Sequence, residues 1–244
     1  GTQVIEGVHS KREALFIDLI KSLDEIKEIS RFRISSIEPN LCTNEIIDFV
    51  AGSQRFMPHF HMPLQSGNNE MLKKMRRRYL CELYSDRVEH IRLRMPHACI
   101  GVDVITGFPG ESDVHFMDTF HFLEDLQIDY IHAFTYSERE NTPAATMPDS
   151  IPINVRRERS NALRNLSLKK KTQHYNRHIG DTRNVLFENS ADKGCVTGFT
   201  DNYIRIVLKD NSSLVNTIQP VELSELISVK GELFISAASM SLAL

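Results

Sequence analysis

Two hydrophobic periods alternate along the first two-thirds of the chain. Apolar residues at helical spacing predict an amphipathic helix over about 10–28 and a second one from Thr43 to Gly52. Between them, residues 31–37 have the composition of a strand, which Pro39 ends because proline cannot continue a central ladder. The same patterns then predict, in order, a strand over 59–64 with Pro58 and Pro63 at its ends, helices over 68–75 and 80–94, a strand over 99–106, a helix over 112–126 and a strand over 128–136. Strands that alternate with helices in this way predict a parallel α/β sheet.

A different pattern begins after a proline-rich loop over 142–152. A long basic helix over 155–178 comes first, and Gly180 follows it as a stop signal. Short strand candidates then lie at 184–188, 195–199, 203–208, 214–218, 221–228 and 232–237, with turn residues at 192–194 and 210–211. Short strands of this kind predict a small all-β barrel. We therefore expect an α/β part over 1–150, a connecting helix over 151–180 and a β-barrel over 181–244.

Composition narrows the class of protein. The chain is 41% hydrophobic and 25% charged, which suits a soluble globular protein, and no apolar run approaches the roughly 18 residues of a membrane span. Its four cysteines are too widely spaced for a disulfide scaffold or a zinc ribbon, and they suit a cytoplasmic protein in a reducing compartment. Because the chain begins at Gly1 rather than at methionine, we expect it to be part of a longer protein.

The net charge of −3 averages two unlike parts. Residues 1–155 hold 16 Lys and Arg against 23 Asp and Glu, whereas residues 156–244 hold 13 against 9. A positive second part permits contact with a polyanion, although a solvated basic helix explains the same numbers.

Polar and glycine-containing segments follow four successive predicted strands. Ligands of α/β barrels and open sheets bind at the carboxyl ends of the strands, so these segments predict a rim for a polar ligand. Asp103 lies within an apolar strand and requires a partner, because an unpaired buried carboxylate is costly. Gly107 and Gly110 permit close approach of a ligand, but the three-glycine dinucleotide spacing is missing. The other rim candidates are Ser35, Ser36, Glu38, Gln65, Ser66, Gly67, Thr106, Glu111, Tyr136, Ser137, Glu138 and Arg139.

His59 and His61 form an H-x-H pair on one predicted strand. Their side chains share a face, so both imidazoles could bind one metal ion, as in a metal-dependent hydrolase. Hydrogen-bonded core histidines give the same pattern, and His132 is the only later strand histidine before the loop. We therefore assign no metal ligand.

Three groups of residues suit a nucleic acid. Dense cations near the rim and along the basic helix suit a phosphate backbone, and barrel aromatics suit stacked bases. Solvated helix ends and core packing are the alternative explanations. The candidates are Arg76, Arg77 and Arg78; Lys169, Lys170 and Lys171; and Phe199, Tyr203 and Arg205.

Seven motifs, in order, resemble the tRNA methylthiotransferases of the radical S-adenosylmethionine class. They are RFRISSIEPN (31–40), HFHMPLQSG (59–67), MRRRY (75–79), GVDVITGFPGE (101–111), YSERENTPA (136–144), RHIG (177–180) and GFTDNYI (198–204). The likeness is greatest to the branch that acts on threonylcarbamoyladenosine beside the anticodon. It implies the later strands of an open (β/α) radical barrel, followed by an RNA-binding β-barrel called TRAM.

The resemblance also implies a cofactor and a partner. In the family, S-adenosylmethionine binds at the strand ends, with the segment of Gln65 and Ser66 near its sugar and amino-acid portions and residues 105–107 near its adenine. The partner would be the anticodon stem-loop of tRNA, and no membrane is implied. The positions carried over for the cofactor are Ser36, Glu38, Gln65, Ser66, Asp103, Ile105, Gly107 and Arg139.

One departure from the family changes the expectation for this chain. Such enzymes hold a 4Fe-4S cluster in a C-x-x-x-C-x-x-C loop, and these 244 residues contain no such loop. Glu140 and Asn141 also stand where many relatives have Pro-Gly. We expect the longer protein to add a methylthio group at C2 of a hypermodified adenosine, and this chain alone to be inactive and prone to self-association through an open barrel edge. A non-catalytic RNA-binding module, or a metal-dependent hydrolase using His59 and His61, stay open as other interpretations.

Overall fold

The protein divides into two compact units. A computed structural model describes residues 3–6, 12–190, 194–209, 212–229 and 231–237. The units comprise residues 1–168 and 169–244, so the division falls within the long helix α6 (Ile153–Asn176) rather than in the loop before it. Among the described helices, none is both long and apolar enough to cross a membrane.

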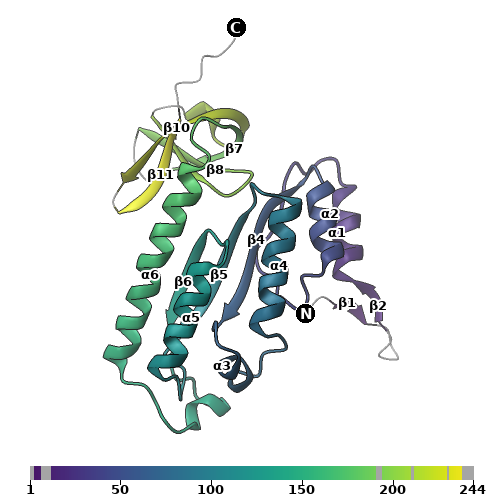
Figure 1. The fold of residues 1–244 in the computed structure, drawn as a ribbon. Helices are drawn as coiled ribbons and strands as arrows, with labels where there is room; N and C mark the ends of the chain where they lie inside the picture. Colours follow the sequence, from purple (N-terminus) through teal and green to yellow (C-terminus); the bar gives the residue numbers. More distant parts are fainter. Residues whose placement is uncertain (1–2, 7–11, 191–193, 210–211, 230, 238–244) are drawn as a thin grey trace. The chain divides into compact units, whose positions relative to one another are not determined.

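The first unit is built on a four-stranded parallel sheet (Figure 1). Its strands, in spatial order, are β3 (Phe32–Ile34), β4 (Phe56–Gln65), β5 (Cys99–Thr106) and β6 (Tyr130–Thr135). The connecting helices are α2 (Asn44–Gly52), α3 (Asn69–Lys74), α4 (Cys81–Arg94) and α5 (Asp113–Asp125). Thr43, Asn68 and Ser112 cap α2, α3 and α5 through their side chains, as their sequence positions predict. The predicted parallel α/β alternation is confirmed.

The two faces of the sheet differ in chemistry. On β4, the fully buried Phe60, Met62 and Leu64 belong to the main hydrophobic core, together with apolar residues of α2 and α4. Because side chains alternate across a strand, His59 and His61 lie on the opposite face. That face therefore carries polar side chains along the middle of the sheet.

The start of the chain differs from the predicted helix over 10–28. Residues Arg12–Leu15 form β2, which pairs with β1 (Gln3–Glu6), and helix α1 spans only Phe16–Asp24. The backbone N–H of Leu15 donates to the carboxylate of Asp18 at 2.8 Å, which fixes the beginning of the helix. The apolar residues that predicted one long helix therefore belong partly to strand β2 and partly to a shorter helix.

Strand β4 is longer than predicted and contains both of its prolines. Pro58 and Pro63 lie inside the strand rather than at its ends. The pairing with β5 shifts register between Pro63 and Gln65, and Gln65 adopts a left-handed backbone with φ 73°. The missing N–H of Pro63 is thus accommodated by an irregular end of the strand, which turns Gln65 at the carboxyl edge.

The second unit contains a closed five-stranded barrel. Its strands are β7 (Thr182–Asn189), β8 (Cys195–Thr200), β9 (Arg205–Lys209), β10 (Ile218–Val229) and β11 (Glu232–Ala237). They close in the order β10-β11-β9-β8-β7 around a core that includes Phe187, Ile206 and Leu223. The small all-β barrel was predicted, but the strand over 214–218 was wrong. A 3-10 turn (Ser212–Leu214) stands there, and the carbonyl of Leu214 accepts both the backbone N–H and the hydroxyl of Thr217.

Candidate functional site

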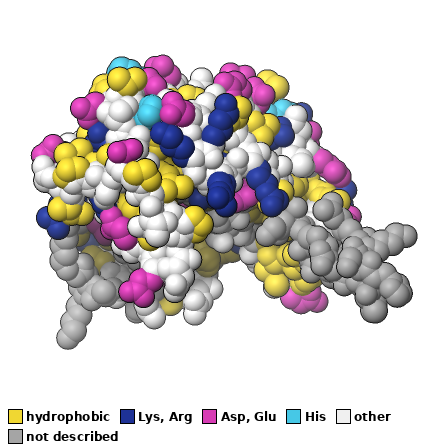
Figure 2. All heavy atoms as spheres, turned by 90° about the horizontal axis from the view of Figure 1, so that it is seen from below, with side chains coloured by type: hydrophobic (Ala, Val, Ile, Leu, Met, Phe, Trp, Pro, Cys, Tyr) yellow, Lys and Arg dark blue, Asp and Glu magenta, His cyan; other side chains and the backbone are white. Residues whose placement is uncertain are grey.

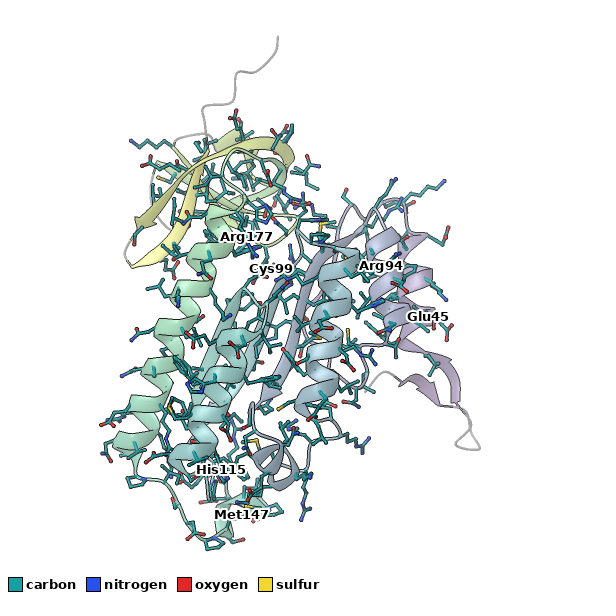
Figure 3. The ribbon with its side chains drawn as sticks, viewed as in Figure 1. Glu45, Arg94, Cys99, His115, Met147 and Arg177 are labelled. Atoms are coloured by element: carbon teal, nitrogen blue, oxygen red, sulfur yellow. The ribbon has the colours of Figure 1, made fainter. Side chains whose placement is uncertain are left out.

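The carboxyl ends of β3 to β6 meet at one edge of the sheet, because the four strands are parallel. In Figure 3, Cys99 marks the beginning of β5, and His115 and Met147 lie toward the opposite end, where the strands finish. Figure 2 shows the molecule from the side on which the strands end, where Lys and Arg side chains lie among acidic and histidine side chains. This edge is the predicted rim.

The segment after β3 presents charged and polar groups at the rim. Ser36 is exposed, and the carboxylate of Glu38 lies 3.6 Å from the guanidinium of Arg77. Arg76 and Arg78, on either side of that arginine, are exposed. The three consecutive arginines therefore differ, because only the middle one is held against the rim.

The Ser66 hydroxyl makes contacts within the protein. Its side chain is buried, its hydroxyl lies 3.1 Å from the hydroxyl of Thr119 on α5, and it accepts the backbone N–H of Asn68. A Cβ on Gly67 would lie 2.9 Å from the Cα of Thr119, so only glycine fits where this turn packs on α5. Gln65, half-buried at the strand end, is the member of this segment that remains at the rim.

The loop after β5 is held by buried ionic contacts. Glu111 is 2% exposed, and its carboxylate accepts the backbone N–H of Gly107 at 2.7 Å and the guanidinium of Arg159 at 2.6 Å. Burial raises the pKa of Glu111, although Gly107 and Arg159 oppose that shift. Gly107 has φ 77°, and a Cβ there would lie 2.2 Å from the side chain of Arg156. The loop shape thus depends on helix α6.

Arg156 ties the loop after β6 to the same helix. Its guanidinium donates to the carbonyls of Tyr136 and Ile151 and to the carboxylate of Glu138 at 2.5 Å. Arg139, which follows Glu138 in the sequence, is exposed. A small apolar cluster of Met71, Phe108 and Tyr136 lies beside these contacts, and Ile105 packs against it. The rim therefore combines an apolar platform with exposed polar side chains.

A row of polar side chains crosses the face of the sheet opposite the helices. The hydroxyl of Tyr130 lies 2.9 Å from a ring nitrogen of both His59 and His61. The other ring nitrogen of His61 lies 2.8 Å from Oδ1 of Asp103, which is also 3.4 Å from Nδ1 of His132. Burial opposes ionisation of Asp103, but interactions with His132 and His61 outweigh it and lower its pKa. The partner that the sequence required for Asp103 is therefore a pair of histidines.

The H-x-H pair is not arranged as two ligands of one ion. Both histidines direct a nitrogen at the Tyr130 hydroxyl, and within the described part of the chain the set of possible metal ligands comprises His61, Asp103 and His132 instead. Sequence reasoning overlooked Tyr130. The signal available was a second i, i+2 pair, Tyr130 and His132, on the neighbouring strand.

The four cysteines do not suit an iron–sulfur cluster. None of them forms a disulfide in the described part of the chain, Cys42, Cys81 and Cys99 are buried, and no described cysteine joins a group of three possible metal ligands. Burial raises the pKa of Cys42 and of Cys81 to about 12, so both are protonated thiols when no metal is bound. The four cysteines are therefore not placed, in the described part of the chain, as ligands of one cluster.

The second unit places the predicted aromatic and basic residues together. The rings of Phe199 and Tyr203 stack with centroids 4.8 Å apart, and Tyr203 has φ 67°. The guanidinium of Arg205 lies 4.5 Å over the ring of Phe234 and pairs with Glu232. Phe199, Arg205 and Phe234 line a cavity of about 780 Å³ on the barrel. Phe199 and Tyr203 are half-buried and stack on each other, and packing within the barrel would produce the same contact without any RNA.

The basic helix is less available to a partner than its composition suggests. Lys169 is exposed, but Lys170 is 8% exposed, and the ammonium of Lys171 lies 5.4 Å from the ring of Tyr175. Arg156 and Arg159 are buried in ion pairs within the first unit. The expected stripe of cations is thus interrupted.

The sequence of this chain is similar to known proteins of one family. Residues 9–123 match the model of the radical SAM superfamily. The chain is 32% identical to the threonylcarbamoyladenosine tRNA methylthiotransferase of Bacillus subtilis over 90% of its own length and 51% of that protein's. The corresponding values are 36%, 79% and 45% for the enzyme of the same name from Rickettsia prowazekii, and 35%, 84% and 46% for the tRNA-2-methylthio-N(6)-dimethylallyladenosine synthase of Pelotomaculum thermopropionicum. The chain spans about half the length of these relatives.

A solved structure supports the fold alone. Coproporphyrinogen III oxidase of Escherichia coli, described as a radical SAM enzyme, aligns with 76% of this chain and 51% of its own with a TM-score of 0.51 at 12% identity.

Proposed function

Since the chain belongs to the radical SAM tRNA methylthiotransferases, we propose that it is part of a longer enzyme that adds a methylthio group to a modified adenosine of tRNA. The observation that carries this proposal is identity of 32–36% to such enzymes over 79–90% of the chain. The match to the Bacillus protein covers 90% of this chain and therefore includes residues of both compact units, which supports the same order of domains in the two proteins.

S-adenosylmethionine would bind at the rim. Gln65, Glu38 and the exposed Arg139 offer polar contacts, and Ile105 offers an apolar surface beside the Met71–Phe108–Tyr136 cluster. A nucleoside joined to an amino acid needs both kinds of contact. Beside a reduced 4Fe-4S cluster held by the rest of the protein, bound S-adenosylmethionine would supply the radical chemistry of the family and a second molecule would supply the methyl group, with a separate sulfur donor for the thio group. Glu111 and Arg159 hold the loop on which Gly107 lies, so they shape the site without needing to touch the cofactor.

The cluster ligands would come from sequence outside these 244 residues, so we expect this chain alone to be inactive. Iron analysis after anaerobic reconstitution tests that expectation. A stoichiometric 4Fe-4S signal from this chain would overturn it, and finding no C-x-x-x-C-x-x-C segment in the upstream coding sequence would favour the RNA-binding module instead.

The decisive experiment uses the full-length enzyme. Host tRNA from cells that lack their own methylthiotransferases is digested to nucleosides after expression of the wild-type enzyme, and mass spectrometry reports the modified base. We expect a methylthio derivative of threonylcarbamoyladenosine. A methylthio derivative of dimethylallyladenosine alone would correct the substrate, and no methylthio nucleoside from a reconstituted enzyme would refute the function.

The anticodon stem-loop of tRNA would contact exposed cations of this chain. Arg76 and Arg78 in the first unit and Lys169 in the second are the exposed members of the predicted groups. Replacing Arg76 and Arg78 by Glu should weaken tRNA binding and flatten its salt dependence, whereas Arg77→Gln, at the residue already near Glu38, serves as the matched control with a smaller effect. Equal salt slopes for wild type and the double variant would remove these arginines from the interface.

The barrel resembles TRAM in the sequence of its motifs, and we propose that Phe199, Tyr203 and Arg205 contact RNA there. Phe199→Ala is the most direct test, since its ring lines the barrel cavity and stacks on Tyr203. A loss of one base stack costs about 1–3 kcal/mol of binding. Unchanged tRNA affinity, with the fold verified by circular dichroism, would assign this ring to packing.

The chain would also associate with itself through the edge strand β3, which pairs only with β4 in the described sheet. Light scattering during size-exclusion chromatography tests this proposal. A monomer at every concentration would reject it, and the short length of β3, three residues, limits how far such pairing extends.

A further inference from the structure

We propose that His61, Asp103 and His132 form a binding site for a divalent metal ion such as zinc, on the face of the sheet opposite the helices. The three residues lie on the neighbouring strands β4, β5 and β6, and Asp103 is the cross-strand partner of His132. One ligand atom from each lies within 4.8 Å of the others. The proposal rests on residues of this chain alone and does not depend on the proposed iron–sulfur chemistry, although Asp103 is also among the positions that the family resemblance assigns to the cofactor.

The donor set is one that zinc commonly uses. Zinc sites take imidazole nitrogens and carboxylate oxygens, and three protein ligands leave a fourth position for water. Metal–ligand distances of about 2.0–2.1 Å in a tetrahedral site place neighbouring donor atoms about 3.3 Å apart. The observed separations from Oδ1 of Asp103, 2.8 Å to His61 and 3.4 Å to His132, require only small movements to reach that spacing.

Hydrogen bonding alone explains the cluster poorly. Oδ1 of Asp103 is shielded from solvent and has no assigned hydrogen-bond partner among the described residues, although a nitrogen of His61 and one of His132 lie 2.8 Å and 3.4 Å from it. Two imidazoles that converge on one oxygen resemble ligands that point at a shared position between them. The rings of His61 and His132 are 5.2 Å apart, which leaves them on either side of such a position.

Tyr130 supports the site as an outer contact. A histidine that binds metal through one nitrogen usually engages its other nitrogen in a hydrogen bond, which fixes the ring. The Tyr130 hydroxyl lies 2.9 Å from Nδ1 of His61, so Nε2 is directed at Asp103. Gly101 makes room for this arrangement, because a Cβ there would lie 2.0 Å from the tyrosine ring. An ion can enter from solvent, since the side chain of His132 is 55% exposed.

The test titrates the metal-free 244-residue chain with Co²⁺, and then displaces it with Zn²⁺. We expect one Co²⁺ per chain, with the visible absorption of a four-coordinate nitrogen and oxygen site and without the near-ultraviolet band that thiolate ligands produce. Asp103→Asn and His132→Gln should abolish stoichiometric binding. Tyr130→Phe should weaken affinity by about 10- to 100-fold, because it removes only the outer contact.

The matched control is His90→Gln. His90 and Asp48 form another histidine–carboxylate pair, 2.9 Å apart, on helices α4 and α2 and without a third ligand. This variant should bind Co²⁺ as the wild type does. Since His132 is exposed, its substitution should leave the fold intact, and circular dichroism verifies that.

A second measurement keeps the proposal falsifiable. Zn²⁺ should raise the melting temperature of the wild type but not that of Asp103→Asn, because an ion that binds only the folded state stabilises it. The proposal is overturned if the wild type binds no Co²⁺, if Asp103→Asn and His132→Gln bind it unchanged, or if the spectrum shows thiolate ligation.

Discussion

Gly101→Ala should damage the polar face of the sheet although it adds a single methyl group. Gly101 lies on β5, opposite Tyr130 on β6. A Cβ at this position would stand 2.0 Å from Cζ and 2.2 Å from the hydroxyl oxygen of Tyr130, far closer than carbon and oxygen atoms can pack. Because the contact is with a fixed ring on the adjacent strand, the ring itself must move.

The expected cost follows from two effects. Forcing a methyl group into a packed site costs about 1–3 kcal/mol. Moving Tyr130 also removes its contacts with His59 and His61, each worth about 0.5–1.5 kcal/mol. The gain from replacing a strand glycine is smaller, about 0.5–1 kcal/mol. We therefore expect the free energy of unfolding of the first unit to fall by about 2–4 kcal/mol.

Urea denaturation followed by circular dichroism measures this loss, and hydrogen exchange of peptides assigns it to the first unit. Gly52→Ala is the matched control: it lies at the end of α2, and a Cβ there has nothing within 4 Å. That control should be neutral or stabilising by up to about 1 kcal/mol. In a Tyr130→Ala background the cost of Gly101→Ala should disappear, since the two positions interact directly.

Two results would refute this reasoning. A midpoint for Gly101→Ala equal to that of the Gly52→Ala control would show that the ring yields at no cost. An equal cost with and without the Tyr130 ring would show that the strain lies elsewhere.

Three further predictions concern a buried ion pair, the pH dependence of stability and the segment after β4. Arg159→Met should destabilise the first unit by about 3–5 kcal/mol, because it strands the buried Glu111 carboxylate, and the double variant with Glu111→Gln should recover part of that loss in urea titrations. Burial lowers the pKa of His178 below 6.5 despite its hydrogen bond with Asp181, so the unfolded chain binds the proton more readily. The second unit should therefore lose stability as pH falls through about 6.5, and His178→Gln should flatten that slope in thermal melts at pH 5–8. Ser66→Ala should lower stability by about 1 kcal/mol without altering affinity for S-adenosylmethionine, whereas Gln65→Ala should weaken that affinity in calorimetry; the reverse pattern would reassign both residues.

The fold could be predicted from the sequence wherever one period dominated a segment. Helix α5 and strand β5 each have a cap or bounding glycine and one clear period, and both appear close to their predicted bounds. Residues 10–28 and 214–218 failed for a different reason. The apolar spacing there contains no information about two local hydrogen bonds. The carboxylate of Asp18 accepts the N–H of Leu15 at the start of α1, and Thr217 donates to the carbonyl of Leu214; such contacts override periodicity.

The candidate site was predictable only at the level of strands. The rule that parallel strands end together placed Glu38, Gln65 and Ile105 at one edge. The rule does not say whether a side chain at this edge points toward solvent or into the protein. Ser66 was therefore grouped with the other three, although its hydroxyl contacts Thr119 on α5. The convergence of His61, Asp103 and His132 required the register between three strands, which no single segment contains.

Charge counting along α6 shows why a basic helix does not by itself define an interface with RNA. Arg156 and Arg159 add to the positive charge of the helix, yet both form ion pairs inside the first unit. Arg156 pairs with a residue of the loop after β6, and Arg159 with one of the loop after β5. Their positive charge fixes the shape of the rim and is not displayed to a polyanion. A phosphate backbone would instead meet exposed cations such as Arg157, Lys169 and Arg78, so replacing Arg157 should flatten the salt dependence of tRNA binding. Replacing Arg159 should change the rim and the stability of the first unit instead. Arg157 and Arg159 are only two residues apart in the sequence, but Arg157 is exposed and Arg159 is buried. The count of positive charge therefore combines a residue that can meet a phosphate backbone with one that holds the rim in shape.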